Sequence, residues 1–266
     1  MTHKRILVAL NLTDGPEPAF ERALALAKTS GAELYLLHAV PADYPHSFRA
    51  ADRLRRATEF RQRAETAGVS VVTAEQAGDP AEIIVLHADA RAVDLVVMGT
   101  ERRTGWARFR QRSVAERVLR RTKRPTLVVA SDDIGDTSGF ENLLVAVDLF
   151  PAGAFGDRAE WLVPEYRGDV LGAARGRLKA VMPPTAGADV KLKGRVASGP
   201  VAETIGMHAA DVSADLIVVG RSRRFMHLGS TAVRILRTTT RALLMVPPTA
   251  TAHVVDTEPS VYRRAA

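Results

Sequence analysis

The sequence predicts an α/β protein in which two related domains follow one another, each built on a parallel sheet. Three observations support this prediction. Short apolar runs rich in Val, Ile and Leu alternate with segments that have helical spacing. Aromatic residues make up 5% of the chain, against 46% for all hydrophobic residues, so the cores are aliphatic, as in sheets covered by helices on both faces. The chain also contains an internal repeat.

The N-terminal half contains five predicted strands separated by four predicted helices. Thr13 or Asp14 is placed to cap the first helix, and Asp79 to cap the third. Ser113 opens the fourth helix, with Glu116 three residues later at the spacing of a capping box. The predicted strands are 5–10, 33–40, 69–78, 94–99 and 126–130, and the predicted helices are 13–32, 48–68, 79–92 and 113–122.

The repeat defines the domain organisation. RILVALNLTDG near the N-terminus returns as NLLVAVDLFPA, DLVVMG returns as DLIVVG, and SVAERVLRRTKRPTLVVA returns as STAVRILRTTTRALLMVP. We therefore expect a first copy at 1–131, a linker at 132–141, a second copy at 142–248 and a polar tail at 249–266.

The second copy is shorter than the first. Asn11 corresponds to Asp148 and Gly99 to Gly220, so the offset between the copies falls from 137 to 121 and 16 residues are missing between the first and fourth strands. Four more residues are missing from the loop after the fourth strand. We expect the second copy to lack its first helix and second strand, or to keep only a remnant of them, and to be smaller, less stable or packed against the first copy.

The net charge of +7 is concentrated in one segment. Residues 101–124 contain ten Arg or Lys against two Glu, so the rest of the chain sums to −1. The absence of cysteine excludes disulfides, thiolate metal sites and cysteine nucleophiles. No apolar run approaches the roughly 18 residues that a membrane helix needs, and the seven histidines show no metal-ligand spacing. We expect a cytoplasmic protein with no membrane span and no metal site.

Four motifs resemble the universal stress protein (UspA) family in its tandem-domain form. They are ILVALNLTDG, DPAE, DLVVMGT, and SVAERVL followed by RPTLVV. The resemblance implies a flavodoxin-like, Rossmann-like fold with a five-stranded parallel sheet of order 3-2-1-4-5 in each copy. It also implies pairing through the last strands, between the two domains or between the subunits of a homodimer. The function that it implies is a non-enzymatic binding or regulatory module in the stress response.

Members of this family that bind ATP carry a glycine pattern after the fourth strand: Gly, two residues, Gly, nine residues, Gly and then Ser or Thr. In the first copy Arg102 and Arg112 stand at two of these glycine positions, and Asn11 stands where the family has an aspartate near the adenosine. The resemblance therefore implies a degenerate adenine-nucleotide site, for ATP or Mg-ATP. Its candidate residues are Asn11, Val40, Met98, Gly99, Arg102, Gly105, Arg112, Ser113 and Val114.

The second copy has the same candidate nucleotide site, but its sequence supports nucleotide binding less than that of the first copy. Arg223 replaces the middle glycine, and the loop that follows is four residues shorter than in the first copy. The retained candidate residues are Asp148, Gly220, Gly229 and Ser230.

Two other functions compete with nucleotide binding. The Arg-rich segment 101–124 could bind acidic partners or polyanions without any nucleotide, although such charge is also typical of a solvated helix face. Sequence-specific nucleic-acid recognition is not expected. An enzymatic role has the least support, because there is no nucleophile elbow and no P-loop. Weak ATP hydrolysis, or autophosphorylation at Ser113, is the enzymatic activity that the sequence does not exclude. We expect His38, at a strand end, to have a backbone partner rather than a catalytic role.

Overall fold

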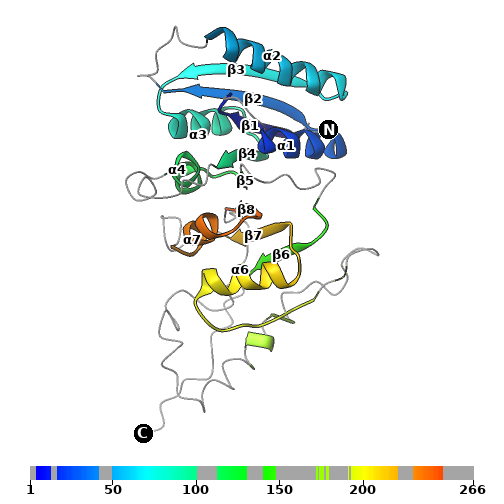
Figure 1. Cartoon of the computed structure of the whole chain (residues 1–266), viewed down its shortest axis with the longest axis vertical. Coiled ribbons are helices and arrows are strands. Elements are labelled where there is room, and N and C mark those ends of the chain that lie inside the picture. The colour runs from blue at the N-terminus through cyan, green and yellow to red at the C-terminus, as the bar shows by residue number, and fades with distance from the viewer. Residues whose placement is uncertain are drawn as a thin grey trace.

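The computed structural model describes residues 4–12, 17–41, 50–100, 113–130, 140–147, 172, 174–176, 178–179, 191, 193–220 and 230–247. The described strands form one eight-stranded sheet of order β3-β2-β1-β4-β5-β8-β7-β6. Figure 1 shows these strands stacked along the long axis of the molecule, so the first copy occupies one end and the second copy the other.

The observed elements follow the predicted alternation of strands and helices. The strands are β1 (Arg5–Leu10), β2 (Glu33–Val40), β3 (Val71–Ala77), β4 (Leu95–Thr100), β5 (Thr126–Ala130), β6 (Leu143–Ala146), β7 (Leu216–Gly220) and β8 (Ala242–Val246). The helices are α1 (Pro18–Ser30), α2 (Ala50–Thr66), α3 (Pro80–Ala90), α4 (Val114–Arg121), α6 (Val201–Asp211) and α7 (Ser230–Thr238).

The first copy has the predicted parallel sheet of order 3-2-1-4-5, which confirms its fold class. Strands β1, β2, β4 and β5 are covered on both faces, and this is why their sequences are continuous apolar runs. β3 lies at the edge of the sheet, and its residues alternate between half-buried and exposed positions over most of its length.

The start of α1 differs from the prediction. The sequence predicts Thr13 or Asp14 as the cap, but both lie outside the described residues, and Glu17 is the N-cap residue. Pro18 follows in the first turn, where its missing N–H costs no helical hydrogen bond. The predicted cap of α3 is confirmed, because Asp79 Oδ1 accepts a hydrogen bond from the backbone N–H of Glu82 at 3.0 Å.

The second copy contributes three described strands. β6, β7 and β8 are parallel and correspond to the first, fourth and fifth strands of the first copy. In the described part of the chain the sheet ends at β6. The predicted loss of the first helix and second strand concerns residues that lie largely outside the described ranges, and it stays a prediction.

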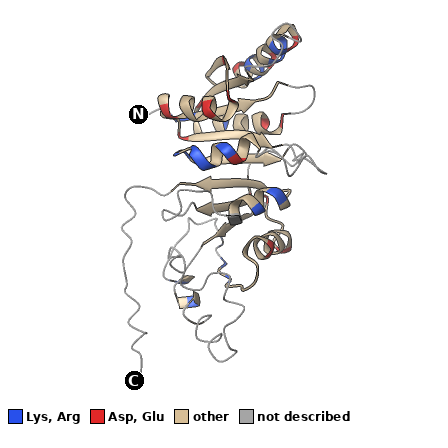
Figure 2. Cartoon of the chain, turned by 90° about the vertical axis from the view of Figure 1, so that its left-hand side faces the viewer, with Lys and Arg blue, Asp and Glu red and all other residues tan. Residues whose placement is uncertain are grey.

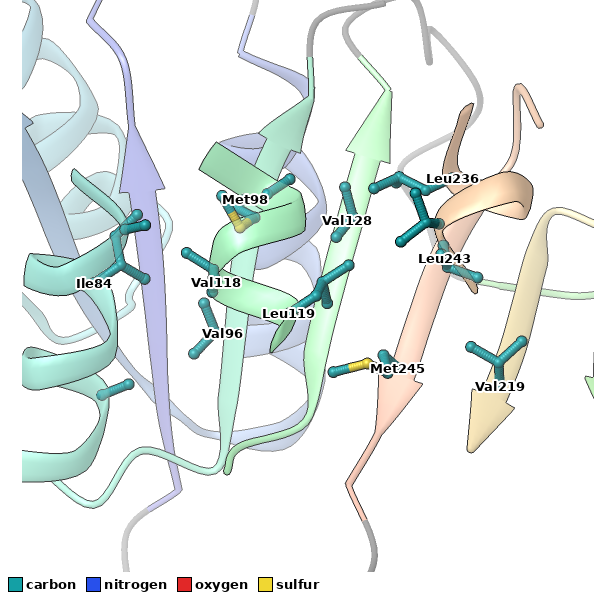
Figure 3. Close-up of a cluster of buried hydrophobic side chains, with 14 of the residues drawn as sticks. Ile84, Val96, Met98, Val118, Leu119, Val128, Val219, Leu236, Leu243 and Met245 are labelled. Carbon is teal, nitrogen blue, oxygen red and sulfur yellow. The ribbon is translucent and has the colours of Figure 1, made fainter. Parts of the chain in front are cut away.

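The two copies join through their last strands. β5 and β8 run antiparallel, side by side in Figure 3 with their arrows opposed. Their register pairs Thr126 with Met245, Leu127 with Leu244 and Val128 with Leu243. Leu127 and Leu244 are counterparts in the repeat, and exchanging the copies reproduces the other two pairs. The seam therefore has approximate two-fold symmetry, and pairing through the last strands occurs within this chain.

Two apolar clusters lie on opposite faces of the sheet. The first, which we call the shared core, lies under α3, α4, α7 and α6 and crosses the seam. Figure 3 shows Leu119 from the first copy near Leu243 and Met245 from the second. The second cluster, which we call the α1-side core, lies under α1 and α2, where the rings of Phe20 and Phe60 have centroids 4.6 Å apart. The two copies are thus packed into one body along the shared core.

A polar triad anchors α3 to the sheet. His87 Nδ1 accepts a hydrogen bond from the Tyr35 hydroxyl at 2.8 Å, and its Nε2–H donates to Gln76 Oε1 at 2.5 Å. This arrangement uses the neutral imidazole. Burial, together with the nearby positive charge of Arg91, lowers the pKa of His87 below its ordinary value of 6.5.

The triad predicts an acid-sensitive contribution to stability. Because the pKa of His87 is lower in the folded than in the unfolded protein, the unfolded protein takes up the proton first as the pH falls below 6.5. We expect the stabilisation of the folded protein by the triad to be complete above pH 6.5 and to be lost as the pH falls below that value. Urea titrations between pH 7.5 and 5 should show a flatter pH dependence in His87→Gln than in the wild type.

A matched control exists in the second copy, where His208 occupies the equivalent position on α6 beside Asp211. His208→Gln makes the same substitution on α6, away from the Tyr35–His87–Gln76 triad. Equal flattening in the two variants would contradict the assignment to His87.

Candidate functional site

The carboxyl ends of β1 and β4 form the switch point of the sheet in the first copy. β1 lies between β2 and β4. α1, which follows β1 in the chain, packs on one face of the sheet through Phe20 and Ala23. α4, which follows β4, packs on the opposite face through Val118 and Leu119. In open α/β sheets the ligand binds in the crevice between two neighbouring strands whose following helices pack on opposite faces of the sheet.

Three candidate residues come together at this edge. Asn11 follows β1, Val40 ends β2, and Gly99 is the last residue but one of β4. Because these three strands are adjacent and parallel, their carboxyl ends lie at the same edge of the sheet. Asn11 and Gly99 are exposed, whereas Val40 is buried. The edge therefore presents Asn11 and Gly99 to solvent, but not the side chain of Val40.

The other candidate residues are placed differently. The Met98 side chain is buried in the shared core, and Val114, the first residue of α4, lies on an exposed part of that helix. In the second copy Gly220 ends β7 and Ser230 begins α7, as the repeat predicts. The candidate residues outside the described ranges are Arg102, Gly105, Arg112, Asp148 and Gly229.

Among the described residues, the space beside Gly99 near the end of β4 is open. The Gly99 backbone does not lie in the left-handed region, so the chain geometry does not require glycine there. A Cβ built on Gly99 would meet no heavy atom within 4 Å in the part of the chain that the structure describes. Gly220, its counterpart in the second copy, has the same two properties. Neither a left-handed backbone nor a clash with the described residues therefore requires glycine at these two positions.

Ser113 caps α4, but the predicted capping box is only half formed. Its Oγ accepts a hydrogen bond from the backbone N–H of Glu116 at 3.1 Å. The Glu116 carboxylate does not return to the cap. It accepts two hydrogen bonds from Arg237 of α7, at 2.7 and 3.0 Å. Because the cap uses Ser113 only as an acceptor, its O–H remains a donor at the N-terminus of the helix.

Two further residues shape this edge. His38 Nδ1–H donates to the backbone carbonyl of Leu10 at 2.9 Å, which confirms the expected backbone partner and joins the ends of β1 and β2. Leu12 has a φ of 53°, in the left-handed region that costs a non-glycine residue about 1 kcal/mol or more. Its side chain is buried in the α1-side core, and burying a Leu side chain gains roughly 2 kcal/mol. Packing thus offsets the strain, and no sequence signal indicated this conformation.

Comparison with known proteins agrees with this architecture. The model of the Universal stress protein family matches the chain twice, over residues 2–130 and 144–247. The chain belongs to the universal stress protein family. A universal stress protein of Methanocaldococcus jannaschii is 32% identical over 141 residues, which cover 48% of this chain and 82% of that protein.

Solved structures support the tandem fold of this universal stress protein. A universal stress protein from Archaeoglobus fulgidus covers 92% of this chain, and 97% of its own length is matched, with a TM-score of 0.66 and 19% identity. A likeness at that identity supports the fold alone. Another match is a universal stress protein in complex with cAMP, 27% identical over 49% of this chain and 99% of that one, with a TM-score of 0.40.

Much of the positive charge on α4 of this universal stress protein is already partnered. Figure 2 shows the basic residues of α4 near the middle of the molecule. Two ion pairs of α4 reach α3 or its cap, Arg117 with Asp79 at 2.5 Å and Arg121 with Glu82 at 3.0 Å. Arg124, which follows α4, pairs with Asp89 of α3 at 3.6 Å. The hydrogen bond from Arg117 lowers the pKa of Asp79. The C-terminal half of the 101–124 segment is therefore largely a helix face neutralised by its neighbour.

Two kinds of site are not found in the described ranges. No group of three or more His, Asp or Glu side chains there is arranged to hold a metal ion. Within the same residues, no helix is long and apolar enough to cross a membrane.

Proposed function

We propose that this universal stress protein is a non-enzymatic stress-response module that binds an adenine nucleotide, ATP or Mg-ATP, at the switch point of its first copy. The observation that carries the proposal is the open position at Gly99, which lies near the end of β4, the strand that precedes α4 in the described residues. A phosphate group needs close approach to backbone and a positive helix end. The glycine at position 99 supports the first requirement, and the N-terminus of α4 supports the second.

Ser113 and Asn11 add the polar groups that such a ligand needs. The O–H of Ser113 is a donor at the positive end of α4, where an anion is stabilised. Asn11 is exposed at the end of β1, and its amide can accept a hydrogen bond from a ribose hydroxyl and donate another. It lacks the charge of the family's aspartate, so we expect weaker binding of the adenosine than in members that keep the aspartate.

We expect the two arginines that replace glycines of the family pattern to bind the phosphates, and this expectation rests on the sequence alone. Arg102 and Arg112 lie outside the described residues. A guanidinium gives charge-assisted, bidentate hydrogen bonds to phosphate, which replace the weaker bonds from backbone amides. Binding of acidic partners or polyanions by the whole 101–124 segment is the alternative. It now depends on residues 101–112, because α4 is largely neutralised by α3.

Calorimetric titration of the full chain with Mg-ATP tests the proposal. We expect one saturable site in the wild type. Gly99→Val would fill the open space with a branched side chain while keeping a strand-compatible backbone, and it should weaken binding at least tenfold. Adenosine and inorganic triphosphate, titrated separately, should show which part of the nucleotide is recognised.

Gly220→Val is the matched control, because it makes the same change at the equivalent position of the second copy. This variant should bind Mg-ATP as the wild type does. Absence of heat at millimolar Mg-ATP would overturn the proposal. Loss of binding in Gly220→Val with normal binding in Gly99→Val would move the site to the second copy.

A further inference from the structure

The first turn of α4 carries a carboxylate at the end of the helix where the proposed site would hold phosphate. Glu116 lies three residues after Ser113, the N-cap residue. The positive end of a helix attracts anions, so a carboxylate in the first turn competes with a phosphate for it. In the capping box that the sequence predicts, this carboxylate would also accept a hydrogen bond from the backbone N–H of Ser113. Glu116 on its own would therefore weaken phosphate binding at this helix end.

The second copy supplies the group that holds this carboxylate away from the cap. Arg237 of α7 donates from Nε and Nη2 to the two carboxylate oxygens of Glu116, at 2.7 and 3.0 Å. A bidentate pair of this kind neutralises the charge and fixes the direction of the carboxylate. The Glu116 side chain has only 5% of its surface exposed, so Arg237 compensates its charge where water hardly can. Among the described residues, the N–H of Ser113 meets no acceptor and is left to a ligand.

The second copy has no equivalent carboxylate of its own. In the repeat, Val233 of α7 corresponds to Glu116, and Arg120 of α4 corresponds to Arg237. The first turn of α7 accordingly contains no acidic residue. The glutamate and the arginine that compensates it therefore occur together, and the pair acts on the helix of the first copy alone. That is the copy for which nucleotide binding is proposed.

We propose that Arg237 of the second copy is a positioning residue for the nucleotide site of the first copy. It holds the Glu116 carboxylate and so leaves the N-terminus of α4 to the phosphates. The inference rests on the proposed function, and it gives the second copy a part in nucleotide binding that needs no nucleotide site in that copy. Arg237 acts through Glu116 and not through contact with the nucleotide.

Calorimetric titration of Arg237→Met tests the inference. We expect the dissociation constant for Mg-ATP to rise at least tenfold, because the carboxylate of Glu116 is then an uncompensated charge near the phosphates. Inorganic triphosphate should lose affinity by a similar factor. Adenosine has no phosphate and should bind Arg237→Met as it binds the wild type. Equal weakening of adenosine and Mg-ATP would overturn the inference, because it would indicate general damage to the fold.

Two control variants separate the effect of the carboxylate from that of lost stability. Arg234→Met removes another arginine of α7, whose partner is Glu203 of α6. Leu243→Ala opens a cavity in the shared core beside the seam and keeps both members of the Glu116–Arg237 pair. Both variants should bind Mg-ATP within about twofold of the wild type. Weakening in Leu243→Ala as large as in Arg237→Met would contradict a role for the carboxylate.

A double variant provides the rescue. Arg237→Met combined with Glu116→Val removes the carboxylate and gives the first copy the residue that the second copy has at Val233. It should bind Mg-ATP within about threefold of the wild type and should be more stable than Arg237→Met, so it serves as a test even if the single variant fails to fold. A double variant that does not recover binding, or an Arg237→Met that binds Mg-ATP normally, would overturn the inference and leave the proposed function intact. A wild type that does not bind Mg-ATP would overturn both.

Discussion

Arg237→Met is expected to lower the free energy of unfolding by about 3 kcal/mol, whereas Glu116→Gln should cost only about 1 kcal/mol. The two side chains form one bidentate ion pair across the seam, but they are buried to different degrees. The Glu116 side chain has 5% of its surface exposed and that of Arg237 has 43%. Removing the arginine leaves a buried carboxylate without its partner. Removing the charge of the glutamate leaves a guanidinium that water can still reach.

The matched control for this pair lies on the same helix. Arg234 of α7 pairs with Glu203 of α6, and both side chains are well exposed. Arg234→Met should therefore change the free energy of unfolding by no more than about 0.5 kcal/mol. Urea denaturation of the three variants checks these values. A Glu116→Gln effect as large as that of Arg237→Met would contradict the assignment of the cost to the buried carboxylate.

The same ion pair distinguishes the two sides of the nearly symmetrical seam. In the repeat Glu116 corresponds to Val233, and Arg237 corresponds to Arg120. The symmetry-related position therefore places Arg120 near a valine instead of a carboxylate, and Arg120 Nε is buried without a hydrogen bond in the part of the chain that the structure describes. A fully symmetrical seam would contain two such ion pairs, but the second copy has valine in place of the glutamate. The Glu116–Arg237 pair therefore depends on the difference in sequence between the two copies.

Leu243→Ala is expected to lower the free energy of unfolding by about 3 kcal/mol and to weaken the first copy as well as the second. Leu243 is fully buried in β8, pairs with Val128 of β5 and belongs to the shared core. A cavity there removes contacts from both copies at once. Hydrogen exchange should become faster in β5, although the substitution lies in β8.

Leu216→Ala is the control for this effect, because Leu216 is buried in β7, which lies next to β8 but not next to β5. It should destabilise the second copy while leaving exchange in β5 closer to that of the wild type. Denaturation of the wild type should follow a single transition, since both copies share one core. Two well-separated transitions would contradict a shared core.

The sequence was sufficient for the order of elements in the first copy and for the tandem repeat. Buried parallel strands need continuous apolar runs, and helices need a 3.6-residue period, so both signals are local and can be counted. The strand order 3-2-1-4-5 was implied by the family resemblance, and the structure confirms it in the first copy. The glycine pattern of the same family singled out Gly99 and Ser113 as candidate residues.

Only the tertiary structure decided how several side chains are used. Glu116 has the spacing of a capping box, yet its carboxylate binds Arg237, which is 121 residues away in the chain. The sequence showed a charge of +8 over 101–124, but not that Arg117, Arg121 and Arg124 meet carboxylates of α3 and its cap. Leu143 and Val145 have the sequence of a buried strand and are exposed. Periodicity reports which face of an element is apolar, whereas the partner of a charge and the cover of a face depend on which distant elements pack there.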